Sequence, residues 1–145
     1  MNYKSDIGYR KEILTLLLNA VIVHENEIVS ALKADFNKPE FETVVTETSY
    51  VISDLKYTIK NISNWAKPER VFPFILNIPS SDTIYKEPYG KVLVIAPWNY
   101  PFQLALCPVI AAVAAGNQVV LKPSELTPNT AAIIQKIIAA IFPIN

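Results

Sequence analysis

The chain contains 145 residues, of which 51% are hydrophobic, so it is long and apolar enough for one ordinary domain with a buried core. Its 13 basic residues balance its 13 acidic residues and are spread along the sequence, so no net field favours nucleic acid or an anionic membrane as a partner. A single cysteine, Cys107, excludes an internal disulfide, and with one histidine, His24, it provides too few ligands for a Cys/His metal site. We therefore expect no bound metal, no export signal in the polar first residues, and a reducing, cytoplasmic setting.

Apolar residues at helical spacing predict two helices at the start of the chain. The first spans residues 6–23 with Ser5 or Asp6 as its N-cap, and the second spans 24–36 and ends at Asn37. Each should bury one stripe of side chains, formed by Ile13, Leu14, Leu17, Val21 and Ile22 in the first helix and by Ile28, Val29 and Leu32 in the second.

A longer pattern predicts a third, continuous helix over residues 41–65, stopped by Pro68. Its apolar positions step by three and four residues over six turns: Phe41, Val44, Val45, Thr48, Val51, Ile52, Leu55, Ile59 and Ile62. We expect this stripe to face the core.

The character of the sequence changes over residues 68–88, which contain four prolines and no helical period. We expect a linker that crosses the surface, with an extended edge strand at 81–86. This divides the chain into an N-terminal helical region with its linker, residues 1–88, and a second unit, residues 89–145.

The second unit alternates strands and helices. Residues 91–96 form a continuous apolar run, which is typical of a strand buried on both faces, and a second strand is predicted at 118–122. Helices are predicted after each strand, at 101–115 and at 129–142, the latter with Thr127 as N-cap and Pro128 at the first helical position. Strand, helix, strand, helix at this spacing is a right-handed βαβα unit of a parallel sheet, so the fold class is α/β, with N-terminal helices followed by half of a Rossmann-like sheet.

One segment, residues 102–121, has the length and apolar content of a membrane span. Gly116 and Asn117 interrupt it with a helix C-cap signal, and Val119 to Leu121 then resemble a new buried strand. We therefore expect a helix, a turn and a strand rather than a transmembrane helix.

Two turns follow the carboxyl ends of the predicted strands, where ligands bind in parallel α/β sheets. They are Pro97-Trp98-Asn99-Tyr100 and Lys122-Pro123-Ser124-Glu125. The chain has only three glycines, which excludes both the Gly-x-Gly-x-x-Gly loop and the Walker loop. A dinucleotide, if bound, is held in another way.

Three ordered motifs resemble the aldehyde dehydrogenase superfamily, in particular its class 3 branch of fatty and aromatic aldehyde enzymes. They are Ala-Pro-Trp-Asn-Tyr-Pro at 96–101, Ala-x-x-Ala-Ala-Gly-Asn at 111–117 and Leu-Lys-Pro-Ser-Glu at 121–125. The resemblance runs from the N-terminal helices to residue 145 and matches about the N-terminal third of such an enzyme. It implies oxidation of aldehydes to carboxylic acids with NAD or NADP.

The resemblance implies a catalytic role for Asn99. Its side-chain N–H would donate to the oxygen of the tetrahedral thiohemiacetal, as an oxyanion-hole donor. The alternative for a turn asparagine is to cap the following helix, here the one that begins near Pro101.

Lys122 and Glu125 are implied to hold the adenosine ribose of the cofactor, together with Ser124. Glu125 would repel a 2′-phosphate, so NAD is favoured over NADP. The alternative is a solvated Lys–Glu pair at the entry to a helix. The other implied cofactor contacts come from the first turn, through Ile95, Ala96, Pro97 and Trp98; for Trp98 and Tyr100, packing in the core is the alternative.

Neither Cys107 nor His24 is expected to take part in chemistry. Cys107 lies in the middle of a predicted helix in apolar company with no base nearby in sequence, which is typical of a buried, inert thiol. His24 lies at a junction between helices and is expected at the surface.

The reaction implied by the resemblance also needs a cysteine nucleophile and a glutamate base. The family segments that carry them, Gly-Gln-x-Cys and Glu-Leu-Gly-Gly-Lys, do not occur in this sequence, and neither does the Gly-Ser-Thr-x-x-Gly cofactor loop. We therefore expect a truncated or split aldehyde dehydrogenase that is inactive by itself, its partners being an aldehyde substrate in the complete enzyme and either a second copy or the missing C-terminal part. The alternative is a non-catalytic remnant or interaction module that pairs with another chain.

Overall fold

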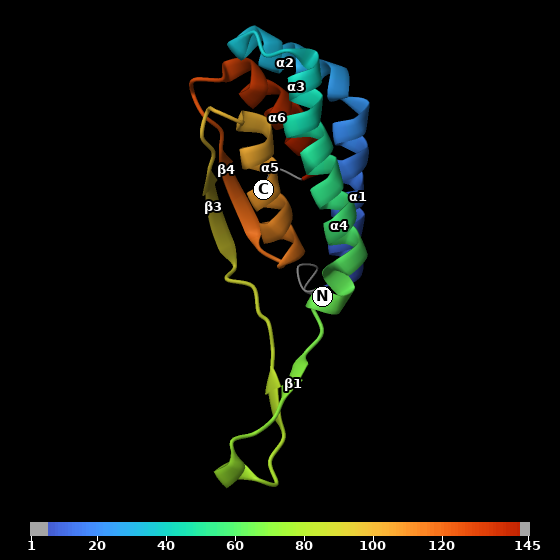
Figure 1. Cartoon of the computed structure of the whole chain (residues 1–145), viewed down its shortest axis with the longest axis vertical. Coiled ribbons are helices and arrows are strands. Elements are labelled where there is room, and N and C mark those ends of the chain that lie inside the picture. Colours follow the sequence, from blue (N-terminus) through green and yellow to red (C-terminus); the bar gives the residue numbers. More distant parts are fainter. Residues whose placement is uncertain (1–5, 143–145) are drawn as a thin grey trace.

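The computed structural model describes residues 6–142 as a bundle of helices on one side of a short parallel ribbon, from which a narrow arm projects (Figure 1). Ser5 as an N-cap, and residues 143–145 of the predicted second unit, lie outside the described residues. In chain order the elements are α1 (Ile7–Val23), α2 (Glu25–Phe36), α3 (Glu40–Thr43), the π-helix η1 (Val44–Thr48), α4 (Ser49–Trp65), β1 (Glu69–Val71), the 3-10 helix η2 (Ile75–Asn77), β2 (Asp82–Ile84), β3 (Lys91–Ile95), α5 (Pro101–Ala114), β4 (Gln118–Lys122) and α6 (Pro128–Ile141).

The helices of both predicted units share one hydrophobic core. The N-terminal helices contribute Leu14, Leu17, Ile28 and Leu55, and the later helices contribute Phe102, Leu106, Ile110, Ile134 and Ile137, all of them almost completely buried. Within α1 the predicted stripe is confirmed except for Ile22, which is 48% exposed. The α/β part is therefore built directly onto the N-terminal helices.

The predicted third helix is interrupted by a π-helical turn, η1, between α3 and α4. The wider turn changes which side chains face inward, so Phe41 and Val45 are exposed, and Thr43 and Glu47 are buried together with the predicted Thr48. The apolar pattern could not predict this because one of the inward positions carries a carboxylate. The predicted stripe is correct at Thr48 and from Val51 onward, through Leu55 and Ile62.

Residues 69–84 form an arm that extends away from the helices (Figure 1) rather than crossing their surface as the sequence predicted. Its strands β1 and β2 pair antiparallel, with Arg70 opposite Thr83. Phe72, Ile75 and Leu76 are at least 70% exposed because the arm has too few strands to bury its own apolar side chains.

The βαβα unit is confirmed to within one residue at each boundary that the structure describes. β3 and β4 pair in parallel, with Leu93 opposite Val120 and Ile95 opposite Lys122, and α5 packs on one face of the pair. The other face is open: Leu93, Ile95 and Val120 are 58–66% exposed. The first strand is therefore not buried on both faces within this chain, because the described residues provide no layer on that side.

The turn between α5 and β4 is confirmed. The Gly116 N–H donates to the Val113 carbonyl at 2.9 Å and the Asn117 N–H donates to the Ala112 carbonyl at 2.9 Å, the pattern of a helix that ends with a left-handed glycine, here at φ 87°. Among residues 6–142 no single helix is long and apolar enough to cross a membrane, although α1 and α2, bent by 65°, satisfy those limits as a pair.

Candidate functional site

The two turns singled out in the sequence lie at the same edge of the β3–β4 pair. Ile95 and Lys122 are partners in the parallel register, and the Ala96 N–H donates to the Lys122 carbonyl at 3.0 Å. The parallel ladder therefore brings the turn that carries Asn99 next to the turn that carries Glu125, which is the arrangement expected for a ligand site in an α/β sheet.

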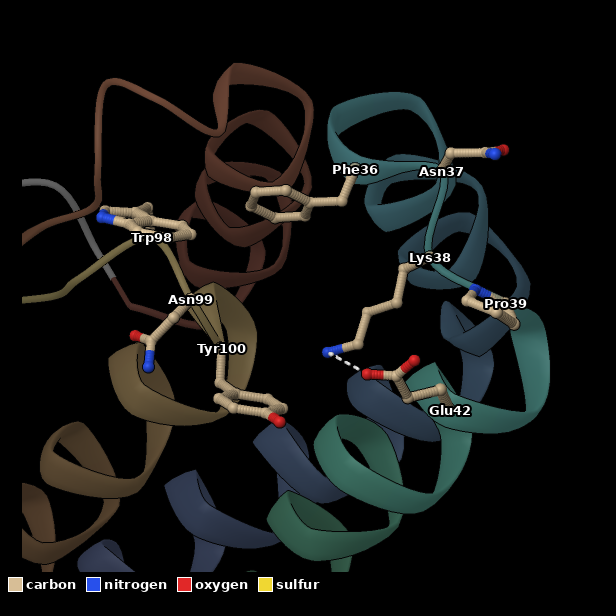
Figure 2. A pocket seen from close by; sticks show the side chains of 8 residues that line it. All are labelled: Phe36, Asn37, Lys38, Pro39, Glu42, Trp98, Asn99 and Tyr100. Atoms are coloured by element: carbon tan, nitrogen blue, oxygen red, sulfur yellow. Dashed lines mark ion pairs between the residues drawn. The ribbon is translucent and has the colours of Figure 1, made fainter.

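The Asn99 side chain is exposed and makes no hydrogen bond with the described residues. It does not cap α5, whose N-cap position is Tyr100 and which receives no side-chain bond from that residue, so the capping alternative is wrong. Asn99 borders a pocket of about 380 Å³ lined by residues 36–39, Glu42 and residues 98–100 (Figure 2). Its carboxamide is thus free to donate to a bound molecule.

The aromatic rings beside Asn99 are part of the pocket wall. Trp98 is 53% exposed and its ring lies 6.5 Å from that of Phe36 on α2, while the Tyr100 ring lies 4.3 Å from Lys38 Nζ, which is centred over it. Figure 2 shows Tyr100 and Lys38 directed toward each other and the Asn99 amide directed away from them. Packing in the core, the alternative for Trp98 and Tyr100, is wrong.

The N-terminus of α5 is capped by Glu47 of η1, an element much earlier in the chain that packs against α5. Glu47 Oε2 accepts from the Phe102 N–H at 2.9 Å and from the Gln103 N–H at 3.1 Å, while its Oε1 accepts from Lys38 Nζ at 2.7 Å. Both charged side chains are buried, Glu47 completely. The pairing satisfies the carboxylate, which would otherwise be costly to bury, and gives α5 the negative charge that a helix N-terminus favours.

Asp35, in the last turn of α2, caps α6 in the same way. Its Oδ1 accepts from the Asn129 N–H at 3.1 Å, and its Oδ2 accepts from the Thr130 N–H at 2.8 Å and the Thr130 hydroxyl at 2.7 Å. Desolvation, the largest single influence, raises the pKa of Asp35, but the hydrogen bonds from Thr130 and Asn129 together outweigh it and lower the pKa below its usual value. Thr127 is at the N-cap position as predicted, yet its hydroxyl donates to the Ser124 carbonyl at 3.3 Å instead of capping α6.

Lys122 and Glu125 form an exposed ion pair, with 2.6 Å between Lys122 Nζ and Glu125 Oε2. The hydrogen bond from Lys122, a backbone hydrogen bond and the lysine charge lower the pKa of Glu125. The pair is exposed to solvent, so by itself it adds little to stability. Both side chains present polar groups to solvent at the edge of the sheet.

The other residues implied to contact the cofactor differ in accessibility. Ile95, Pro97 and Trp98 are exposed, whereas Ala96 is 5% exposed. Ser124 is 7% exposed, and its Oγ accepts from the Leu126 N–H at 3.2 Å, so the serine shapes its own turn. The accessible side chains at this edge therefore come from both turns.

Neither Cys107 nor His24 lines the pocket beside Asn99. Burial, with the charge and hydrogen bond of Asp54 on α4, raises the pKa of the Cys107 thiol to about 12. The thiol is only partly buried and faces a carboxylate, so its predicted wholly apolar surroundings were wrong, although a protonated thiol remains the expectation. His24 is near the surface, with Nδ1 2.8 Å from Glu27 Oε1.

Three residues of this region, Lys38, Glu47 and Asp35, were not predicted from the sequence. Only Asp35 could have been recognised from the sequence around it. A carboxylate in the last turn of a helix interacts unfavourably with the dipole of that helix, which indicates a hydrogen-bond partner in another element. Glu47 had none, because its inward orientation depends on the π-helical turn.

Comparison with known proteins identifies the family. A model described as the aldehyde dehydrogenase family matches residues 3–144. The chain is 44% identical over 140 residues to 4,4'-diaponeurosporen-aldehyde dehydrogenase of Staphylococcus aureus, covering 97% of this chain and 30% of that protein. It is 48% identical over 133 residues to aldehyde dehydrogenase family 3 member H1 of Arabidopsis thaliana, covering 90% of this chain and 28% of that protein.

A solved structure described as the substrate-bound state of Staphylococcus aureus AldH superposes with a TM-score of 0.93 at 43% identity, covering 97% of this chain and 31% of that one. The chain thus spans about 30% of the length of the relatives it matches, over the N-terminal part of their fold. With the family model matched over nearly its whole length, this chain belongs to the aldehyde dehydrogenase family and resembles its class 3 members.

Proposed function

We propose that this chain is the N-terminal part of an NAD(P)-dependent enzyme that oxidises aldehydes to carboxylic acids, and that it supplies the oxyanion donor and part of the cofactor site. The observation that carries the proposal is the exposed Asn99 carboxamide, without a hydrogen-bond partner among the described residues, at the same sheet edge as Lys122 and Glu125. Family membership supports the reaction class.

Asn99 acts on the charge that develops during the reaction. When a thiolate attacks the aldehyde carbon, the carbonyl oxygen becomes an alkoxide, and a side-chain N–H aimed at it stabilises the tetrahedral species. One such donor contributes about 3 kcal/mol to the barrier. The nucleophilic cysteine and the base that activates water come from segments outside this sequence.

The nicotinamide dinucleotide supplies the hydride acceptor when bound, and Lys122 and Glu125 are proposed to hold its adenosine ribose. Their exposed polar groups fit hydroxyls that both donate and accept hydrogen bonds. The negative charge of Glu125 disfavours a 2′-phosphate, which makes NAD the favoured cofactor. The N-termini of α5 and α6 are already occupied by Glu47 and Asp35, so neither is free to bind the pyrophosphate.

We propose further that the 145 residues alone are inactive. The one thiol, Cys107, is held protonated by a pKa of about 12 and does not line the pocket beside Asn99. A protonated thiol is a poor nucleophile.

Fusing this chain to the part of the Staphylococcus aureus relative that follows the matched region tests the proposal. The fusion should produce NADH from a medium-chain aldehyde, and the 145-residue chain should not. Asn99→Ala should lower kcat by about a hundredfold or more while the KM for NAD stays the same, because the donor acts in the transition state.

Asn61→Ala on α4 is the matched control, since Asn61 Nδ2 donates only to the Tyr57 carbonyl of its own helix among the described residues. An active fusion that tolerates Asn99→Ala would refute the role of Asn99. Turnover by the 145-residue chain alone would refute its inactivity.

A second candidate function, a non-catalytic module that pairs with another chain, is favoured by the open apolar face formed by Leu93, Ile95 and Val120. The two proposals differ in the fusion experiment. A fusion that folds and binds NAD but oxidises no aldehyde would favour the pairing module.

A further inference from the structure

We propose that Glu47 and Lys38 are positioning residues that hold the Asn99 turn in place, an inference that rests on the proposed role of Asn99. They touch the backbone and the aromatic ring that flank Asn99, while leaving its carboxamide free. Neither residue is on the sheet that carries the turn; both belong to the N-terminal helical layer.

Glu47 holds the end of the turn nearest α5. Its Oε2 accepts from the N–H groups of Phe102 and Gln103, three and four residues after Asn99, so the carboxylate determines where α5 begins. Because the first N–H groups of a helix have no partners within the helix, this contact is the one that a shift of the turn would break.

Lys38 holds the side of the turn nearest the pocket. Its ammonium bonds Glu47 at 2.7 Å and lies 4.3 Å from the centre of the Tyr100 ring, one residue after Asn99. Glu42 Oε1, at 4.0 Å, is the other carboxylate oxygen paired with Lys38 among the described residues (Figure 2). A cation between a buried carboxylate and an aromatic face has a defined position, so it limits where Tyr100 can lie.

On the other side of the turn, the Ala96 N–H donates to the Lys122 carbonyl at 3.0 Å. The residues between Ala96 and Phe102 are thus held at both ends and at Tyr100, while the Asn99 carboxamide makes no hydrogen bond with the described residues. This is the arrangement that a preorganised donor requires, since it needs no rearrangement when charge develops.

Two unfavourable local features, a π-helical turn and a buried hydroxyl without a hydrogen bond, accompany these contacts. Glu47 is buried on the π-helical turn η1, and the buried Thr43 Oγ1 just before this turn has no hydrogen-bond partner in the part of the chain that is described. Apolar residues in place of a buried ion pair are often at least as stabilising, so the buried Lys38–Glu47 pair is better explained by the geometry that it imposes than by its contribution to stability.

Amide hydrogen exchange in the 145-residue chain tests the local part of the proposal. Glu47→Gln keeps the size of the side chain and one acceptor oxygen but removes the charge. We expect exchange at the Phe102 and Gln103 amides to become about tenfold faster, with α1 and α6 unchanged. Equal acceleration in all helices, or none at these two amides, would overturn the proposal.

Asp35→Asn is the matched control, because Asp35 caps α6 by the same kind of contact. It should accelerate exchange at Asn129 and Thr130 and leave Phe102 and Gln103 unchanged. If Asp35→Asn affects the Phe102 and Gln103 amides as strongly as Glu47→Gln does, the effect is not specific to Glu47.

The fusion protein described above tests the link to catalysis. Lys38→Met should lower kcat by about tenfold or more with the KM for NAD unchanged, and Lys38→Arg, which keeps the charge over Tyr100, should restore most of it. If the variants at the buried Lys38 fail to fold, Tyr100→Leu provides the same test of kcat, because it removes the ring under the lysine at a partly exposed position.

The outcomes separate this inference from the proposed function. If Glu47→Gln accelerates exchange at the Phe102 and Gln103 amides but the unmutated fusion oxidises no aldehyde, the proposed function is refuted. The contact of Glu47 with α5 would then be structural only. An active fusion whose kcat is unchanged by Lys38→Met, or by Tyr100→Leu, would refute the positioning role and leave the function intact.

Discussion

The thiol of Cys107 lies beside the carboxylate of Asp54 on the neighbouring helix, and this contact determines the reactivity of the chain's one cysteine. Burial, the Asp54 charge and its hydrogen bond all raise the pKa of the thiol, from 9.0 to about 12. Only the thiolate reacts with alkylating agents. A rise of about three units in the pKa of the thiol therefore reduces the fraction of thiolate by roughly a thousandfold.

We therefore predict that iodoacetamide modifies Cys107 at about pH 8 roughly a thousandfold more slowly than it modifies free cysteine. Mass spectrometry at timed intervals measures the rate. Asp54→Asn should speed the reaction because it removes the negative charge, while burial still keeps it slow. A rate equal to that of free cysteine in the folded chain would show that the thiol is ionised.

At the scale of single elements, α5 and α6 both begin without a cap from their own N-cap side chain. In each case a carboxylate from the N-terminal helical layer takes that place, Glu47 for α5 and Asp35 for α6. The helices that follow the two strands are thus tied at their N-termini to helices that come much earlier in the chain.

We predict that Asp35→Asn lowers the free energy of unfolding by about 1 kcal/mol near neutral pH, the usual contribution of a helix cap. The pKa of Asp35 is lowered by folding, so its contribution is present above the unfolded value of about 3.8 and is lost as the pH falls through the lower folded value. The difference between the wild type and Asp35→Asn should therefore shrink from about pH 6 to about pH 2.

Urea denaturation followed by circular dichroism measures this difference at each pH. Asp82→Asn is the matched control, because it removes the same charge from the arm, away from any helix N-terminus. A difference that stays constant down to pH 2 would indicate that the ionised carboxylate is not responsible.

At the scale of the whole molecule, all the helices of the bundle lie on one side of the β3–β4 ribbon and leave its other face open (Figure 1). Leu93, Ile95 and Val120 form this face, and the two-stranded ribbon also has unpaired edges. Open apolar faces and edges promote association between copies.

We predict that the 145-residue chain self-associates through this face, and that Leu93→Thr with Val120→Thr reduces the association without lowering the thermal midpoint. Size-exclusion chromatography with light scattering measures the mass. Leu126→Thr, which changes an equally exposed leucine in the following turn, is the control. The prediction is wrong if Leu126→Thr reduces association as much as the pair does.

Much of the architecture followed from local patterns. Helical spacing predicted α1, α2 and α6, and the glycine turn at 116 ended α5 as expected, since these features depend on residues within a few positions of each other. The order of strands and helices then predicted the parallel pairing, which aligns the turns that carry Asn99 and Lys122.

The sequence by itself therefore determined the family, the order of the elements and the two turns of the candidate site. Only the tertiary structure decided that Asn99 does not cap a helix. The carboxylates that cap α5 and α6 belong to Glu47 and Asp35, which are separated from Phe102 and Thr130 by 55 and 95 positions along the chain. Contacts at such separations depend on how whole helices pack and on one π-helical turn, and neither leaves a periodic signal in the sequence.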